Sequence, residues 1–141
     1  MANAAYNTGY KLAFDGTNVW GAADYRAMML DSTGTAAYDA THDDVADVVA
    51  NEISQAARAT LGNEAIVQDD TNDQIECDCD DIVFSSLAAG DTPDCVVIYL
   101  HTGVEANDIL LCMAELTTPP APNGGDYTLN VHADGIMKSS I

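Results

Sequence analysis

The chain has 141 residues, enough for one ordinary domain, and its 23 acidic residues face only four basic ones, which gives a formal net charge of −19. Nucleic-acid binding relies on clustered Lys and Arg, and an anionic membrane surface repels an acidic protein, so we expect neither as a direct partner. No run of about 18 apolar residues is present and residues 1–10 lack the basic and apolar regions of a secretory signal, so we expect neither a membrane span nor a signal peptide.

The acidic residues are mostly aspartate, 18 Asp against 5 Glu, and Lys11 and Lys138 are the two lysines. In dilute buffer such crowding of like charge pushes a compact fold apart. In about 1 M salt the Debye length shrinks to about 3 Å, so neighbouring carboxylates barely repel each other. The composition therefore indicates a protein adapted to very salty surroundings; the alternative is an acidic surface protein from an ordinary environment.

The first half of the chain predicts an arm, two strands and a helix. Residues 1–8 are small and polar, so we expect a flexible arm followed by a single domain over residues 9–141. Tyr10–Phe14 alternates imperfectly and stops at the turn-forming residues 15–18, which predicts a strand and a turn, and Tyr25–Leu30 is the next strand candidate.

A short amphipathic helix is predicted over residues 43–51. Thr41 can cap its start, and Asp43 and Asp44 favour the positive end of the helix dipole. Apolar residues then recur at helical spacing, namely Val45, Val48, Val49 and Ile53. We expect this helix to cover a sheet edge or an open end of a barrel.

The second half of the chain is dominated by strand patterns. Gln74–Asp80 alternates with period two, so that Ile75, Cys77 and Cys79 are expected to face inward. The runs Cys95–Leu100 and Ile109–Met113 are apolar throughout, which is typical of central strands buried on both faces.

The last predicted strand, Tyr127–Val131, follows a Pro- and Gly-rich loop at residues 119–125. Six to nine short strands with one helix predict a mainly β protein: a single-domain antiparallel β-sandwich or jelly-roll-like barrel with one short α-helix.

The cysteines do not match a metal or disulfide pattern. Cys77 and Cys79 are two residues apart, whereas structural zinc sites use C-x₂₋₄-C pairs with further ligands at set spacing. With Cys95 and Cys112 they could form two disulfides by count, but a domain of this length needs no such staples. We expect four reduced cysteines that act as small buried apolar residues.

The acidic run Asp69–Asp73 resembles a calcium loop only superficially. An EF-hand that starts at Asp69 requires glycine at its sixth position and glutamate at its twelfth, where this chain has Gln74 and Asp80. A solvated turn between strands is the better interpretation, and weak cation binding by Asp78, Asp80 and Asp81 stays open.

No residue pattern predicts a catalytic centre. His42, His101 and His132 lie far apart and outside an HExxH frame, and the serines lack a GxSxG motif; these are Ser85, Ser86, Ser139 and Ser140. Gly-rich phosphate loops are also missing from the sequence. We therefore expect no enzyme activity, no catalytic or metal-binding residues and no cofactor.

From about residue 50 onward, the order of features is similar to that of a family of small virion proteins of tailed phages. The segments that carry this resemblance are Ala50–Ser54, Asp80–Phe84, Val96–Tyr99 with Thr102–Gly103, Gly125–Val131 and Ala133–Ile136, and the Gly16–Thr17 turn and the Tyr25–Leu30 strand also fit. The resemblance implies a capsid cement or decoration protein with a jelly-roll-type sandwich. This chain departs from the family in its acidity, its few aromatic and lysine residues and its Pro-Pro-Ala-Pro loop.

This resemblance predicts stabilisation of a capsid shell from its outside, in a virion that assembles in the host cytoplasm, and the acidic composition adds that the tailed virus is halophilic. The expected partners are the major capsid protein and a second or third copy of the chain, as a dimer or trimer. We expect residues 1–8 and the uncharged loop at residues 117–125 to contact neighbours. The alternatives are a tail, neck or turret component, and a receptor- or glycan-binding module, for which Trp20 is the one tryptophan available.

Overall fold

A computed structural model of the chain describes residues 4–17, 19–31 and 38–140, and this part is mainly β with antiparallel sheets. A five-stranded sheet has the order β1-β8-β7-β2-β3, a three-stranded sheet the order β10-β5-β4, and β6 pairs with β9. The strands are β1 (Ala4–Ala5), β2 (Tyr25–Leu30), β3 (Ala59–Thr60), β4 (Ala65–Asp69), β5 (Gln74–Asp78), β6 (Ile82–Phe84), β7 (Cys95–Leu100), β8 (Leu110–Glu115), β9 (Tyr127–Leu129) and β10 (Met137–Ser140). The helical segments are α1 (Asn7–Phe14) and the 3₁₀ turns η2 (Val45–Asp47), η3 (Val49–Asn51) and η4 (Glu105–Asn107).

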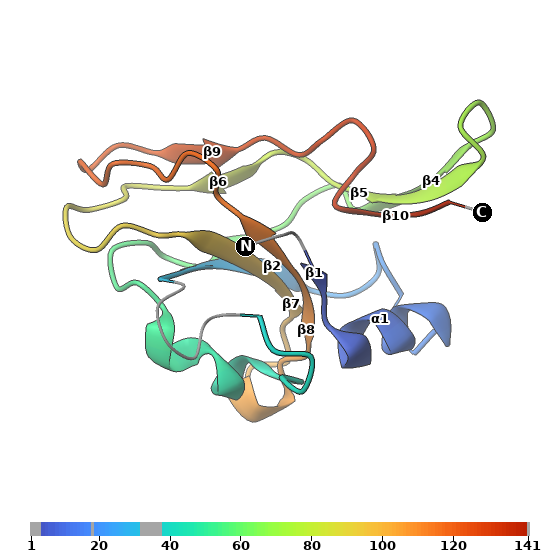
Figure 1. The fold of residues 1–141 in the computed structure, drawn as a ribbon, viewed down its shortest axis with the longest axis horizontal. Helices are drawn as coiled ribbons and strands as arrows, with labels where there is room; N and C mark the ends of the chain where they lie inside the picture. Colours follow the sequence, from blue (N-terminus) through green and yellow to red (C-terminus); the bar gives the residue numbers. More distant parts are fainter. Residues whose placement is uncertain (1–3, 18, 32–37, 141) are drawn as a thin grey trace.

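The five-stranded sheet forms the middle of the molecule. The two smaller sheets lie over one of its faces, and α1 and the 3₁₀ turns lie on the other side (Figure 1). This arrangement confirms the predicted sandwich-like class with one α-helix among the described residues, and the sheets do not close into a barrel.

Strand β7 shows that the middle sheet is buried on both faces, as its unbroken apolar sequence predicts. Val96 and Ile98 belong to the core beneath the smaller sheets. Val97 and Tyr99 point the other way and belong to a second core under the 3₁₀ turns. Because side chains alternate across a strand, an apolar residue at every position is needed to fill two cores at once.

Residues 4–8 differ from the flexible arm that we expected. Ala4 and Ala5 pair with Met113 and Cys112 as the edge of the middle sheet. The side chain of Tyr6 is 0% exposed in the second core. The remaining residues of the expected arm, 1–3, lie outside the described residues.

The prediction of a strand at Tyr10–Phe14 is wrong, because this segment forms most of α1. Gly9 packs directly against β8, where an added Cβ would lie 2.1 Å from the carbonyl oxygen of Leu110. Gly9, Leu12 and Ala13 stand at i, i+3 and i+4, the spacing of one helix face, and they are less exposed than Tyr10 between them. Contact of this face with the sheet decides the conformation.

The segment 43–51 is helical but is not the continuous α-helix that we predicted. It forms η2 and η3, which are separated by Val48 with φ −122°. Asp44, rather than Thr41, caps η2 by accepting a hydrogen bond from the Ala46 amide. Short 3₁₀ turns are enough here, because they place Val45 and Val48, which stand at i and i+3, in the second core. The segment therefore covers a sheet face, not the edge or barrel end that we expected.

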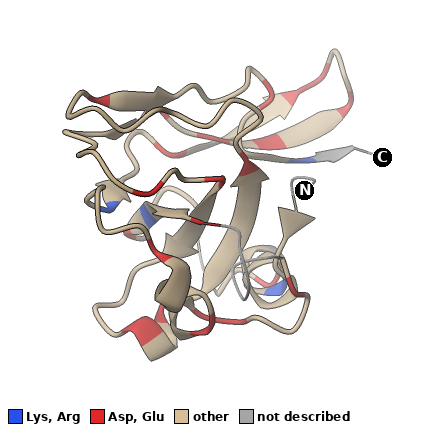
Figure 2. Cartoon of the chain, turned by 60° about the vertical axis from the view of Figure 1, so that its left-hand side comes forward, with Lys and Arg blue, Asp and Glu red and all other residues tan. Residues whose placement is uncertain are grey.

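Acidic residues are kept out of the middle of the sandwich. Strands β2 and β7 contain no Asp or Glu, and β8 contains one at its last position. The acidic segments lie mainly in the connections, the short helical turns and the smaller sheets (Figure 2). The interior of the sheet can thus stay apolar although the whole chain carries a charge of −19.

Candidate functional site

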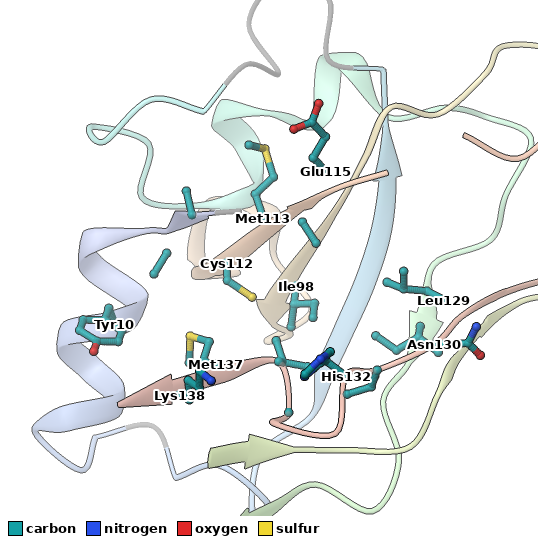
Figure 3. Close-up of a pocket in the computed structure, with 17 residues that line it drawn as sticks. Tyr10, Ile98, Cys112, Met113, Glu115, Leu129, Asn130, His132, Met137 and Lys138 are labelled. Atoms are coloured by element: carbon teal, nitrogen blue, oxygen red, sulfur yellow. The ribbon is translucent and has the colours of Figure 1, made fainter. Parts of the chain in front are cut away.

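A groove of about 670 Å³ lies between the edge of the middle sheet and the segment from residue 129 to residue 138. Its walls are mostly apolar and include Ile98 and Cys112 from the middle sheet and Met137 from β10 (Figure 3). Its volume lies within the range of about 300–1,000 Å³ that small-ligand pockets occupy. Sequence analysis missed it, because its walls come from residues as far apart as Ala4 and Lys138.

The Cys112 thiol in the wall of the groove is not an activated nucleophile. Burial, followed by the nearby Cys77 and Cys79, raises the pKa of the Cys112 thiol to about 12, so this thiol stays protonated at neutral pH. Lys138 Nζ donates to Asp134, and the Asp134 amide donates to His132 Nδ1 at 3.1 Å. Hydrogen bonds therefore connect Lys138, Asp134 and His132 at the rim.

The four cysteines, two of which we considered as metal ligands, act as small apolar groups. Cys79 and Cys112 are buried, Cys77 is half-buried, and all four cysteines of the chain are free. Burial also raises the pKa of Cys79 to about 12, with Asp78 as the next cause.

The facing predicted for β5 is partly wrong. Ile75, which we expected to point inward, is 45% exposed, whereas Gln74 and Glu76 are buried and Gln74 Nε2 donates to Glu76 Oε1 at 2.5 Å. Strand β5 and its neighbour β4 extend past the body of the sandwich (Figure 1). Ile75 lies on this projecting part of the strand, where no apolar core is available to bury it.

The acidic run at residues 69–73 is the turn between β4 and β5, as predicted. Asp69 Oδ1 accepts hydrogen bonds from the amides of Thr71 and Asn72 at 2.8 and 3.1 Å, and Oδ2 accepts from Asn72 Nδ2 at 2.7 Å. The Asn72 side chain, followed by these amides, lowers the pKa of Asp69. This carboxylate is a turn-forming group.

The carboxylates of Asp78, Asp80 and Asp81 bind separate protein groups. Asp78 accepts from the Cys79 amide, Asp80 from Asn63 Nδ2 and Asp81 from the Val131 amide, at 2.9, 2.7 and 2.8 Å. Within residues 4–17, 19–31 and 38–140, no group of three or more His, Cys, Asp or Glu side chains could hold a metal ion.

Among the three histidines, His101 belongs to a hydrogen-bond network with Asp108 and Thr102. His101 Nδ1 lies 3.0 Å from Asp108 Oδ2, while Oδ1 accepts from the amide and hydroxyl of Thr102 at 2.6 and 2.8 Å. Burial opposes ionisation of Asp108, but these hydrogen bonds outweigh it and lower its pKa. The Asp108 carbonyl also accepts from the Val45 amide at 2.8 Å, so this network ties the 101–108 loop to η2.

A second polar network, which the sequence analysis missed, centres on Arg58. Its guanidinium donates to Glu52 at 2.7 and 2.6 Å and to Glu105 at 2.7 Å, and it lies 5.6 Å from the centroid of the Tyr99 ring. The hydrogen bond with Glu52 is the first cause of a raised Arg58 pKa. Because Glu105 is 47 residues away in sequence, no local pattern could indicate this network.

Two exposed features remain as candidate docking surfaces. The first is the loop at residues 117–125, which is largely exposed and is held by hydrogen bonds between Leu87 and Gly124 and Gly125, at 2.7 and 2.8 Å. The second is the outer side of β4, which we call the β4 edge: residues Ala65–Asp69, of which the first four are exposed.

Trp20 does not form an exposed aromatic platform. Its side chain is 7% exposed, its Nε1 donates to the Asp78 carbonyl at 2.9 Å, and its ring lies 4.6 Å from that of Tyr25. The tryptophan on which a glycan-binding role would depend is thus a core residue.

Comparison with models of protein families, with curated protein sequences and with solved structures finds no match to this chain. Among the described residues, no helix is long and apolar enough to cross a membrane.

Proposed function

We propose that the protein is a virion structural protein that decorates or cements the outer surface of a tailed-virus capsid in very salty surroundings. The observation that carries this proposal is the loop at residues 117–125. Its nine residues contain three of the four prolines and no charged side chain, in a chain with a net charge of −19. Proline limits the conformations of the free loop, so less entropy is lost when such a loop docks on a partner.

The remainder of the molecule suits a structural role. The middle sheet has an apolar core on each face, which supports a rigid module. Carboxylates in the connections keep this module soluble at high ionic strength. The proposed partners are the major capsid protein, contacted through the 117–125 loop, and further copies of the chain.

The test is the composition of purified virus particles, combined with imaging that places the protein. Decoration of a shell predicts on the order of hundreds of copies per particle at the outer surface. About six or twelve copies would instead favour the tail, neck or turret alternative, which shares the same fold and acidity. Absence of the protein from particles contradicts both.

The salt argument has its own test. We expect the free energy of unfolding to rise from dilute buffer to molar potassium chloride, because screening removes carboxylate repulsion. Choline chloride at equal ionic strength is the control for specific potassium binding. Stability that does not depend on ionic strength contradicts the proposed adaptation.

A further inference from the structure

The β4 edge is an open sheet edge in the single chain. Strand β4 pairs with β5 along one side, and no described strand pairs with its other side. Alternate residues of such a strand direct their N–H and C=O groups outward, so the edge is a template for one more strand. The ligand that it fits is therefore an extended backbone.

Apart from Asp69 at its end, the β4 edge lacks the features that usually prevent such pairing. Residues 65–68 contain no charged residue, proline or glycine, and β4 pairs with β5 over five residues without a bulge. Ile66 is 60% exposed and Val67 is 37% exposed. On the other outer strand of this sheet, β10, the chain places Lys138.

We propose that a second copy of the chain pairs with this edge, β4 to β4, and forms an antiparallel dimer with a continuous six-stranded sheet. A two-fold axis through Val67 places Val67 opposite Val67 of the second copy, Ile66 opposite Gln68, and Ala65 opposite Asp69. No two carboxylates stand directly opposite each other in this register. The strand is thus complementary to itself, which is the condition for a closed two-fold interface.

Side chains on both faces support this register. Cross-strand partners lie about 4.5–5.5 Å apart, so the two Val67 side chains meet on one face. On the other face the two Ile66 side chains are diagonal neighbours at about 7–8 Å, and Ile75 shares that face through its pairing with Gln68. The exposed apolar residues of the hairpin thereby become an interface.

This inference decides between the dimer and trimer that the sequence left open, and it does not depend on the capsid assignment. Antiparallel pairing of one edge with itself uses a two-fold axis and produces a dimer. Charge on Asp69 of one copy and Asp78 of the other weakens the pairing in dilute buffer, because both side chains lie on the same face as the Ala65 between them.

The first experiment measures molecular mass in molar potassium chloride by sedimentation or light scattering. We expect twice the chain mass for the wild type and the single-chain mass for Val67→Asp, which places two carboxylates at the axis beside Glu76, the cross-strand partner of Val67. The matched control is Val83→Asp, which introduces the same charge at an exposed valine of β6 and should stay dimeric. Circular dichroism spectra and thermal melting check that both variants fold.

A second experiment tests the register. Val67→Cys should give a covalent dimer under a mild copper oxidant, whereas Gln68→Cys should not, because its copies are about 7–8 Å apart on the diagonal. The wild type under the same oxidant gives the background from the native cysteines. Three results would overturn the proposal: a monomeric wild type, a dimeric Val67→Asp variant, or equal cross-linking at both positions. If the wild type is monomeric and Val67→Asp no longer binds virus particles, the β4 edge contacts the capsid shell instead of a second copy.

Discussion

Strands β7 and β4 are both rich in β-branched apolar residues, yet one lies in the interior and the other at the surface. Val96, Val97 and Ile98 of β7 are at most 3% exposed, because a layer of chain packs on each face of the middle sheet. Ile66 and Val67 of β4 stay exposed, because the β4–β5 hairpin projects past those layers. The comparison teaches that local pattern selects a strand, while the surrounding layers decide whether it supports the fold or is available to a partner.

The largest effect is expected from a substitution in the second core, which packs on one face of the middle sheet. Tyr6→Ala removes a fully buried ring that lies 5.3 Å from the Tyr38 ring in the second core. Loss of a buried aromatic side chain lowers the free energy of unfolding by about 3–5 kcal/mol. Urea denaturation in molar potassium chloride measures this change.

Tyr10→Ala is the matched control for Tyr6→Ala, since it removes the same ring from the exposed side of α1. We expect it to cost under about 1 kcal/mol, as surface substitutions usually do. Equal losses for the two variants would contradict the burial of the N-terminal segment. Because Tyr6 is a core residue, removal of residues 1–8 cannot serve as a clean test of docking.

A smaller effect is expected for Asp108→Asn, which weakens the connection between the middle sheet and η2. The variant leaves the Thr102 and His101 donors without a charged acceptor in a site where Asp108 is 1% exposed. We expect a loss of about 2–3 kcal/mol at neutral pH in urea denaturation. Asp91→Asn, which changes an exposed carboxylate, is the control and should have little effect.

The pH dependence of this loss follows from the lowered pKa of Asp108. A carboxyl whose folded pKa lies below its unfolded value, ordinarily 3.8, contributes its full stability above that value. The contribution is lost as the pH falls through the folded pKa. The difference between wild type and Asp108→Asn should therefore be constant near neutrality and shrink in acid; a difference that grows in acid contradicts the assignment.

The sequence correctly predicted the elements whose residue pattern agrees with the burial of their side chains. Strands β2, β7 and β8 follow from runs of apolar residues, and the Asp69 turn follows from turn-forming residues. It failed for α1, where contact between Gly9 and β8 decides the conformation, and for Ile75, whose strand projects past the core. The groove and the Arg58 network join residues distant in sequence, so no local pattern could predict them.

The smallest difference between a variant and its control is expected at the junction that joins the projecting sheet to the body. Gly135 precedes β10, has φ +75°, and approaches β5 so closely that an added Cβ would lie 2.4 Å from the Cys77 carbonyl oxygen. Gly103 has φ +92°, but nothing lies within 4 Å of its added Cβ. Alanine at either position has the strain of a positive φ, about 1–2 kcal/mol, and only Gly135→Ala adds the clash.

We therefore expect Gly135→Ala to lower the free energy of unfolding by about 1–2 kcal/mol more than Gly103→Ala, because the clash forces β10 away from β5. Amide hydrogen exchange locates the damage. Protection should fall in β5 and β10 and stay unchanged in β7, since the middle sheet has its own two cores. If β7 loses protection equally, the projecting sheet and the middle sheet open as one cooperative unit. The two sheets then differ in the exposure of their side chains and not in their stability.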